Sequence, residues 1–228
     1  MQVVVQEGEF DPTKVVVPIV ALNDEDGSVE FLGSGFFVGE ESFLVTAHHV
    51  IKGKDYIDIV VLPNLDNVYT ATLIKEDTEV DLSVLHVEGY RPERRLALYP
   101  DNNLLFNQPC VCCEYGTTRS LGNRVEISPA VRMGNITRCF KSLDFYGKAG
   151  EMALELSFPA LQGASGAPIM TSDNFLVMGI IIANLAYHLL PAQIEETLNQ
   201  DGEKVEEVRY MLPQAIAVHV KHLRMLLE

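Results

Sequence analysis

The sequence predicts an all-β fold built of antiparallel sandwiches or barrels. Three observations support this: short runs of β-branched and aromatic residues recur along the chain, turn-forming clusters separate them, and helical periodicity is rare. The chain has 228 residues, of which 47% are hydrophobic. That is enough apolar material for the core of one large domain or of two small ones.

The predicted strands fall into two sets. The first set is Val15–Leu22, Phe31–Val38, Phe43–Ala47, Ile57–Leu62, Thr70–Ile74 and Leu82–Val87. The second set is Cys110–Tyr115, Val125–Ser128, Ala130–Phe140, Met152–Phe158, Ala167–Met170, Phe175–Ala183 and Glu207–Leu212. Between them lies Tyr90–Asn107, which is rich in Arg, Pro, Asp and Asn. We therefore predict two units, residues 1–100 and 101–228.

Two segments look helical. Near the C-terminus, one helix face would be formed by Ile216, Val220, Leu223 and Leu227, and Pro213 suits the start of that helix. We expect this C-terminal helix to dock on the second unit. The other segment, Ala192–Asn199, lies in a polar insertion from about Leu185 to Lys204, which we interpret as a surface excursion.

The charge balance disfavours two classes of partner. The chain has 17 Lys and Arg against 32 Asp and Glu, a net charge of −15. Such a surface repels phosphate backbones and anionic lipids, so we expect no nucleic acid and no membrane partner. The sequence does not indicate an oligomeric state.

The four cysteines point to a reducing compartment. Three of them, Cys110, Cys112 and Cys113, crowd into one apolar run, while Cys139 stands alone. This is a poor disulfide framework and lacks the paired spacing of a zinc site, so we expect buried, reduced thiols and no metal. The N-terminal residues show no signal peptide. Together these features predict a cytoplasmic protein.

The strongest local motif is Gly163–Pro168, which reads G-A-S-G-A-P. A turn of small residues exposes the Ser165 hydroxyl and lets backbone N–H groups converge on one point. The amides of Gly163 and Ser165 could then stabilise an oxyanion. On its own the motif is ambiguous, since Gly-rich turns with a central Ser also connect ordinary strands.

Two further motifs complete a catalytic set. Leu44–Val50 is a strand that runs into two histidines. Asp81 comes directly before the apolar strand Leu82–Val87. A Ser hydroxyl needs a base such as His to become a nucleophile at neutral pH, and the His needs a carboxylate that fixes its tautomer. The sequence supplies His, Asp and Ser in that order.

These motifs resemble those of the chymotrypsin-fold, trypsin-like serine peptidases, and in particular the bacterial, disulfide-free Deg/HtrA-like protease domains. The T-A-A-H motif of that family corresponds to Thr46–His49, its D-[LIV]-A-V-L segment to Asp81–Leu85, and its G-x-S-G-G-P turn to Gly163–Pro168. Gly33–Val38 resembles the G-[ST]-G-F strand before the His, and Gln108–Gly116 resembles the first strand of the second barrel. The likeness extends over nearly the whole chain, although no PDZ domain is expected within it.

The resemblance implies a fold and a mechanism. The fold would be two six-stranded antiparallel β-barrels with a C-terminal α-helix, the first barrel carrying His49 and Asp81 and the second carrying Ser165. Ser165 would attack a peptide carbonyl, His49 would act as general base and then acid, and Asp81 would orient His49. An acyl-enzyme would form and be hydrolysed, with no metal or organic cofactor. The substrate would be a protein or peptide, and a specific protein partner is plausible for an intracellular enzyme.

Two details stay open in the sequence. His48 is adjacent to His49, and only the register with the motif favours His49 as the base. The primary specificity pocket would be lined by Pro159 and Gln162 on one side and by Ile182 and Ala183 on the other. Because Pro159 stands where a trypsin-like pocket needs an acid, we expect cleavage after a small to medium apolar residue.

The main alternative is a catalytically silent trypsin-like domain that binds a partner protein. An esterase is disfavoured by the order of the three residues and by the lack of α/β alternation. A cysteine mechanism, used by viral proteins of this fold, is disfavoured because no Cys occupies the Gly163–Pro168 turn.

Overall fold

The first six strands close into a barrel. The computed structural model describes residues 11–22, 28–54, 57–121, 124–142, 151–188, 193–199, 202–208 and 211–228. The strands are β1 (Val16–Leu22), β2 (Val29–Val38), β3 (Phe43–Ala47), β4 (Asp58–Val60), β5 (Val68–Asp77) and β6 (Leu82–Val87). They are antiparallel in the order β1-β2-β3-β6-β5-β4, and β1 pairs with β4 to close the barrel. A 3₁₀ turn, Pro12–Lys14, precedes β1, and the short helix α1 (His48–Ile51) follows β3.

Six later strands close into a second barrel. They are β7 (Pro109–Glu114), β10 (Ala130–Ser142), β11 (Glu151–Leu156), β12 (Pro168–Thr171), β13 (Val177–His188) and β16 (Met211–His219), in the order β10-β11-β16-β13-β12-β7. Helix α2 (Val220–Leu227) follows β16. The predicted fold class is therefore confirmed: the protein is all-β, with two six-stranded antiparallel barrels and a C-terminal helix. The predicted division at residue 100 falls between β6 and β7, in the connection from one barrel to the other.

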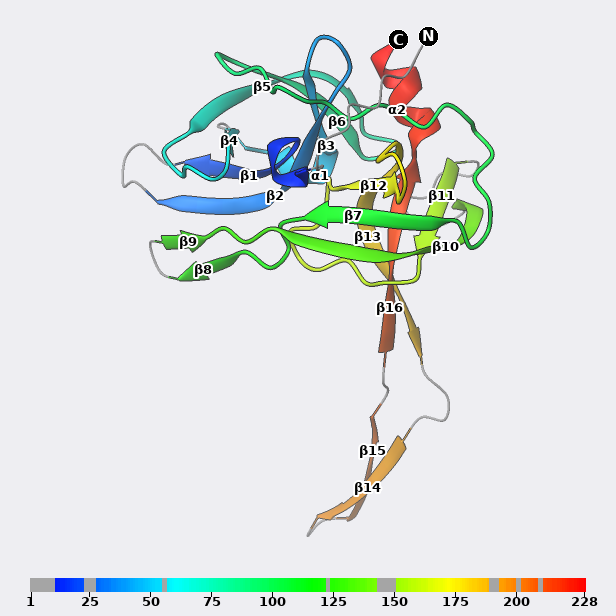
Figure 1. Ribbon diagram of the computed structural model, residues 1–228. Helices are drawn as coiled ribbons and strands as arrows, with labels where there is room; N and C mark the ends of the chain where they lie inside the picture. The colour runs from blue at the N-terminus through cyan, green and yellow to red at the C-terminus, as the bar shows by residue number, and fades with distance from the viewer. Residues whose placement is uncertain are drawn as a thin grey trace.

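Two ribbons stand outside the barrels (Figure 1). β8 (Arg119–Leu121) pairs with β9 (Arg124–Glu126), and β14 (Gln193–Asn199) pairs with β15 (Gly202–Val208). Strands β13 and β16 continue beyond the second barrel, and the β14–β15 ribbon lies at the far end of this arm. The insertion is thus a long β-arm.

Two helix predictions are corrected by the structure. The predicted helix Ala192–Asn199 is wrong, because Gln193–Asn199 is strand β14. The C-terminal helix begins at Val220 and not after Pro213, because Ile216 belongs to β16 and pairs with Ala183. The helical spacing of Ile216 from Val220 is a coincidence: Ile216 is buried inside a strand whose neighbours Ala217 and Val218 are buried as well.

One hydrophobic core spans the two barrels. The larger cluster of buried residues combines Val16 and Phe37 of the first barrel with Val111, Tyr115 and Val177 around the second. The Tyr115 hydroxyl also crosses between the barrels and donates to the Val16 carbonyl at 3.0 Å. The barrels are therefore packed together over an apolar interface, which sets the position of the loops that they share.

Candidate active site

Strand pairing brings His49 and Asp81 together. β3 ends at Ala47 and β6 starts at Leu82, and these two residues are paired, so the segments beyond them lie side by side. Asp81 adopts a left-handed backbone conformation, with φ of 60°, and its carbonyl accepts a hydrogen bond from the His48 amide at 2.9 Å. This local turn directs the Asp81 side chain at His49, the residue that follows His48 in the chain.

Asp81 contacts His49 through both carboxylate oxygens. Oδ1 accepts from the His49 backbone amide at 2.8 Å, and Oδ2 lies 2.5 Å from Nδ1 of the imidazole. The Asp81 side chain is 7% exposed, whereas that of His49 is 41% exposed. The carboxylate is therefore shielded behind the ring that it orients, and the imidazole is open to solvent. A carboxylate in this position favours the tautomer that carries the proton on Nδ1.

The neighbouring histidine points elsewhere. Nδ1 of His48 lies 3.2 Å from Ser83 Oγ and 3.1 Å from Glu76 Oε2. Asp81 contacts His48 only through backbone atoms. The geometry therefore pairs Asp81 with His49 and places His48 in a separate polar cluster.

Ser165 lies in a tight turn whose two glycines have left-handed backbones. The φ angles are +93° at Gly163 and +85° at Gly166. The turn is fixed internally, since the Ala164 amide donates to Leu161 O at 2.9 Å and the Ala167 amide donates to Ala164 O at 3.0 Å. Among the described residues, no acceptor is found for the amides of Gly163 and Ser165, so neither amide is used by the turn itself.

The Ser165 turn packs directly on the segment that leads to His49. A Cβ at Gly166 would collide with Ser34 O and Thr46 Oγ1 and would come within 3.1 Å of the Ala47 amide. A Cβ at Gly33 would lie 3.0 Å from Ser165 O and 2.9 Å from Val50 Cγ2, so one glycine touches both motifs. The sequence-predicted motifs around His49, Asp81 and Ser165 thus meet at one place between the barrels.

The segments predicted to line the specificity pocket are joined by an amide that the sequence analysis did not select. Asn184 Oδ1 accepts from the Ala160 amide at 2.8 Å, and Asn184 Nδ2 donates to Ala160 O at 2.6 Å. Pro159 next to Ala160 is half-buried, and on β13 Ile182 is buried while Ala183 is half-buried. The only signal for Asn184 was a polar residue at the end of an apolar strand.

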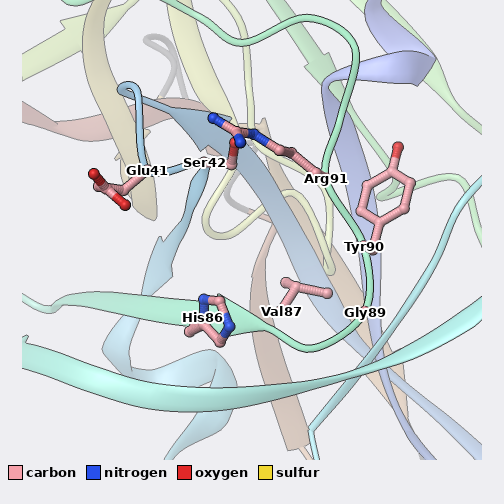
Figure 2. A pocket seen from close by; sticks show the side chains of 7 residues that line it. All are labelled: Glu41, Ser42, His86, Val87, Gly89, Tyr90 and Arg91. Atoms are coloured by element: carbon pink, nitrogen blue, oxygen red, sulfur yellow. The ribbon is translucent and has the colours of Figure 1, made fainter.

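Two pockets are lined by described residues of the barrels and their loops. One, of about 300 Å³, borders the Ser165 turn and is lined by Phe31, Leu32, Gly116, Thr118, Gln162 and Gly163. Gln162 is exposed on its rim. The other, of about 390 Å³, lies on the first barrel at the end of β6 opposite Asp81 (Figure 2). There Arg91 extends toward Ser42, while Glu41 and His86 also line the pocket, so its charges are mixed.

The cysteines are not suited to act as nucleophiles. Cys110, Cys112 and Cys113 are buried and free. Burial raises the pKa of the Cys110 and Cys113 thiols to about 12, so neither forms a thiolate at neutral pH.

Among the described residues, no group of three or more His, Cys, Asp or Glu side chains could hold a metal ion. In the same part of the chain, no helix is long and apolar enough to cross a membrane.

Comparison with known proteins identifies the family. Residues 33–180 match the family model of the trypsin-like peptidase domain. The magnetosome formation protease MamE of Paramagnetospirillum magneticum is 27% identical over 156 residues, which cover 68% of this chain and 20% of MamE. The serine endoprotease DegS of Haemophilus influenzae is 27% identical over 182 residues, or 78% of this chain and 49% of DegS. The chain thus spans a fifth to a half of these relatives.

Solved structures show the same fold. The HtrA-type protease AlgW, solved with a decapeptide, superposes with a TM-score of 0.64 at 16% identity, covering 94% of this chain and 64% of AlgW. The active form of the Rv3671c protease from M. tuberculosis gives a TM-score of 0.61 at 18% identity, covering 94% of this chain and 80% of that one. With the family model matching most of the sequence, the chain belongs to the trypsin-like peptidase family.

Proposed function

We propose that the protein is a serine endopeptidase that uses Ser165, His49 and Asp81 as its catalytic triad. One observation carries the proposal: Asp81 bonds both the backbone and the ring of His49, directly beside the turn that presents Ser165. A carboxylate that holds the backbone of the residue with one oxygen and its exposed imidazole with the other is the arrangement that orients a general base.

In the proposed reaction, Ser165 Oγ attacks the carbonyl carbon of the scissile bond. His49 accepts the hydroxyl proton and then delivers it to the leaving amine, while Asp81 stabilises the imidazolium. The available amides of Gly163 and Ser165 bind the oxyanion of the tetrahedral intermediate. Water, activated by His49, then hydrolyses the acyl-enzyme and restores Ser165.

The substrate is proposed to be an extended protein or peptide segment. AlgW has been solved with a decapeptide, and the exposed imidazole of His49 leaves room for a segment of that kind. Neither Phe158–Ser165 nor Ile180–Asn184 contains an acidic residue that could pair with a cationic side chain. We therefore propose cleavage after small to medium apolar residues, by an enzyme that processes a particular protein partner. A peptide library cleaved chiefly after Arg or Lys would contradict this specificity.

The compartment is also a proposal. The cysteines of the second barrel are free and mostly buried, which is compatible with a reducing environment such as the cytoplasm. Localisation of the tagged protein by cell fractionation tests this directly.

The catalytic proposal is tested by nucleophile and base variants. Wild type should react with a fluorophosphonate probe and hydrolyse a peptide library, and Ser165→Ala should lose both activities. His49→Ala should lower kcat by at least about 10³-fold, because it removes the group proposed to take the Ser165 proton. His48→Ala is the matched control and should stay within about 10-fold of wild type.

The variants also separate the alternatives. A wild type that neither reacts with the probe nor cleaves any peptide would instead support the silent, partner-binding domain. Greater loss in His48→Ala than in His49→Ala would reverse the assignment of the base. Labelling together with ester hydrolysis, but no peptide cleavage, would favour the esterase.

A further inference from the structure

We propose that Ser34 is a positioning residue of this site: it crosses from the first barrel and sets the direction of the peptide groups that form the oxyanion hole. The proposal rests on the proposed function, because it assigns Ser34 a part in the same reaction. Ser34 lies in β2, far from Ser165 in the chain, and its side chain would not touch the substrate.

Every polar group of Ser34 is used, and Ser34 is 0% exposed. Its amide donates to Ser165 O at 2.9 Å, and its hydroxyl donates to Gly163 O at 2.9 Å. The same hydroxyl accepts from the Tyr115 amide at 3.1 Å, while Ser34 O accepts from Thr46 Oγ1 at 2.8 Å. One buried residue thus joins the Ser165 turn, the residue that directly follows β7, and β3.

The two bonds to the turn fix the directions of its peptide groups. In a planar trans peptide, the C=O and the following N–H point in opposite directions. With Gly163 O held by Ser34, the Ala164 N–H points away from Ser34, where it donates to Leu161 O. With Ser165 O held as well, the Gly166 N–H points to Ile181 O.

The peptide between these two is thereby fixed from both sides. Its carbonyl, Ala164 O, accepts from the Ala167 amide, so the Ser165 N–H points the opposite way and stays available. The Gly163 N–H is the other amide without a protein acceptor among the described residues. The hydroxyl of Ser34 therefore stabilises the orientation in which both amides can meet an oxyanion.

The partner of Ser34 on the second barrel is itself fixed. Tyr115 lies between Glu114 and Gly116, and the buried Glu114 carboxylate accepts from Arg132 Nε at 2.9 Å and from the Gly116 amide. Gly116 packs on the Ser165 turn, since a Cβ there would lie 2.8 Å from Leu161 Cβ. The Tyr115 amide is thus a firm anchor for the Ser34 hydroxyl.

Removal of the hydroxyl should affect the transition state more than the ground state. In Ser34→Ala, Gly163 O loses its donor and the peptide that follows it can rotate, which disturbs the adjacent oxyanion amides. Loss of one oxyanion donor lowers kcat by about 10²–10³-fold. A disturbed but complete pair of donors should give a smaller loss, about 10- to 100-fold in kcat, with KM changed less than about threefold.

The test compares Ser34→Ala with a variant that loses a buried hydroxyl elsewhere. Thr171 Oγ1 accepts from the Leu176 amide at 3.1 Å, and Thr171 is buried at the end of β12 away from the turn. Thr171→Val should move the urea midpoint by an amount similar to Ser34→Ala and leave kcat unchanged. Ser34→Thr keeps the hydroxyl and should restore kcat to within about threefold of wild type.

Two ligands give a readout that stability alone cannot produce. A peptide boronic acid forms a tetrahedral adduct with Ser165 and needs the oxyanion amides, whereas a product peptide binds without them. In Ser34→Ala, affinity for the boronic acid should fall in proportion to kcat/KM, and affinity for the product peptide should change less than about twofold. Should Ser34→Ala fail to fold, Ser34→Cys keeps the volume with a weaker donor and carries the same comparison.

The possible failures are distinguishable. An active wild type with an equally active Ser34→Ala would overturn the role of Ser34 and leave the peptidase proposal intact. Equal losses of boronic acid and product affinity would also overturn it, because they would indicate a general structural effect. A wild type that is neither labelled nor active would overturn both proposals together.

Discussion

At the scale of single residues, glycines decide how closely the Ser165 turn can approach the first barrel. Gly166 has a left-handed backbone and lies against Ser34 O and Thr46 Oγ1, where no Cβ fits. Gly39 has a similar φ of +70°, but apart from Gly39 itself and its two chain neighbours, no residue has an atom within 4 Å of the position that its Cβ would take. The two positions therefore share one backbone conformation and differ in the available space.

We predict that Gly166→Ala destabilises the protein far more than Gly39→Ala. A left-handed backbone costs a non-Gly residue about 1 kcal/mol, which is all that Gly39→Ala should lose. Gly166→Ala adds a collision with backbone atoms, and its free energy of unfolding should fall by about 3 kcal/mol or more. Urea denaturation of the two variants measures the difference. Equal losses would show that close packing of the turn contributes nothing.

At the scale of elements, the end of β7 is held by a buried ion pair. Glu114 is fully buried, and Arg132 on the neighbouring strand β10 is its cationic partner at 2.9 Å. The first barrel has an exposed pair for comparison, Lys54 with Glu30 at 2.6 Å. Burial makes the two pairs unequal, since a carboxylate that loses its partner inside the protein keeps a desolvated charge.

Arg132→Met should therefore lower the free energy of unfolding by about 3 kcal/mol, because it leaves Glu114 buried and unpaired. Lys54→Met should cost less than about 1 kcal/mol, because its pair is solvated. The double variant Glu114→Gln/Arg132→Met should recover part of the loss, since it removes the charge and keeps an acceptor for the Gly116 amide. Thermal or urea denaturation of the three proteins is the measurement, and a loss no greater than that of Lys54→Met would refute the argument.

The elements also show how far sequence patterns reach. Phe43–Ala47 and Leu82–Val87 were predicted with the bounds that the structure has, because each is a compact apolar run between turn residues. Ala192–Asn199 was predicted as a helix, but Gln193–Asn199 is strand β14. Its pairing with Gly202–Val208 is a contact that local spacing does not reveal.

The candidate active site also has one part that the sequence predicted and one part that only the structure reveals. The sequence motifs predicted that the segments around His49, Asp81 and Ser165 would meet, and these segments do lie together. Ser34 lay within a recognised motif, but its hydroxyl bonds Gly163, 129 residues away, and Tyr115, 81 residues away. Such bonds follow from the packing of two barrels, which a single sequence does not specify.

At the scale of the whole molecule, helix α2 links parts that are distant in the sequence. It packs on β13 and β16 of the second barrel and on β5 of the first. Its Arg224 side chain also donates to Pro100 O at 2.8 Å and to Asn102 Oδ1 at 2.5 Å, in the connection between the barrels. The start of α2 is capped by His219, whose Nδ1 accepts from the Lys221 amide at 3.0 Å.

His219 should make the stability of the assembled barrels depend on pH. Burial, followed by the positive charges of Lys221, His222 and Arg224, lowers its pKa from 6.5 to about 4, and the nearby backbone of Asn102 opposes this only in part. The unfolded chain therefore binds a proton near pH 6.5 that the folded protein does not bind until about pH 4. The stabilisation is complete above pH 6.5 and is lost as the pH falls from 6.5 toward 4.

Between pH 7 and pH 5, this single group should cost the folded protein about 2 kcal/mol. The control is His219→Asn, which retains a side-chain acceptor for the helix cap and removes the titration. The wild type and His219→Asn contain the same carboxylates. The difference between their free energies of unfolding in urea at each pH therefore reports on His219 alone. The wild type should lose stability toward pH 5 more steeply than His219→Asn, and parallel pH profiles would contradict the prediction. Because α2 contacts both barrels, its loosening in acid should also reduce peptidase activity at temperatures where His219→Asn remains active.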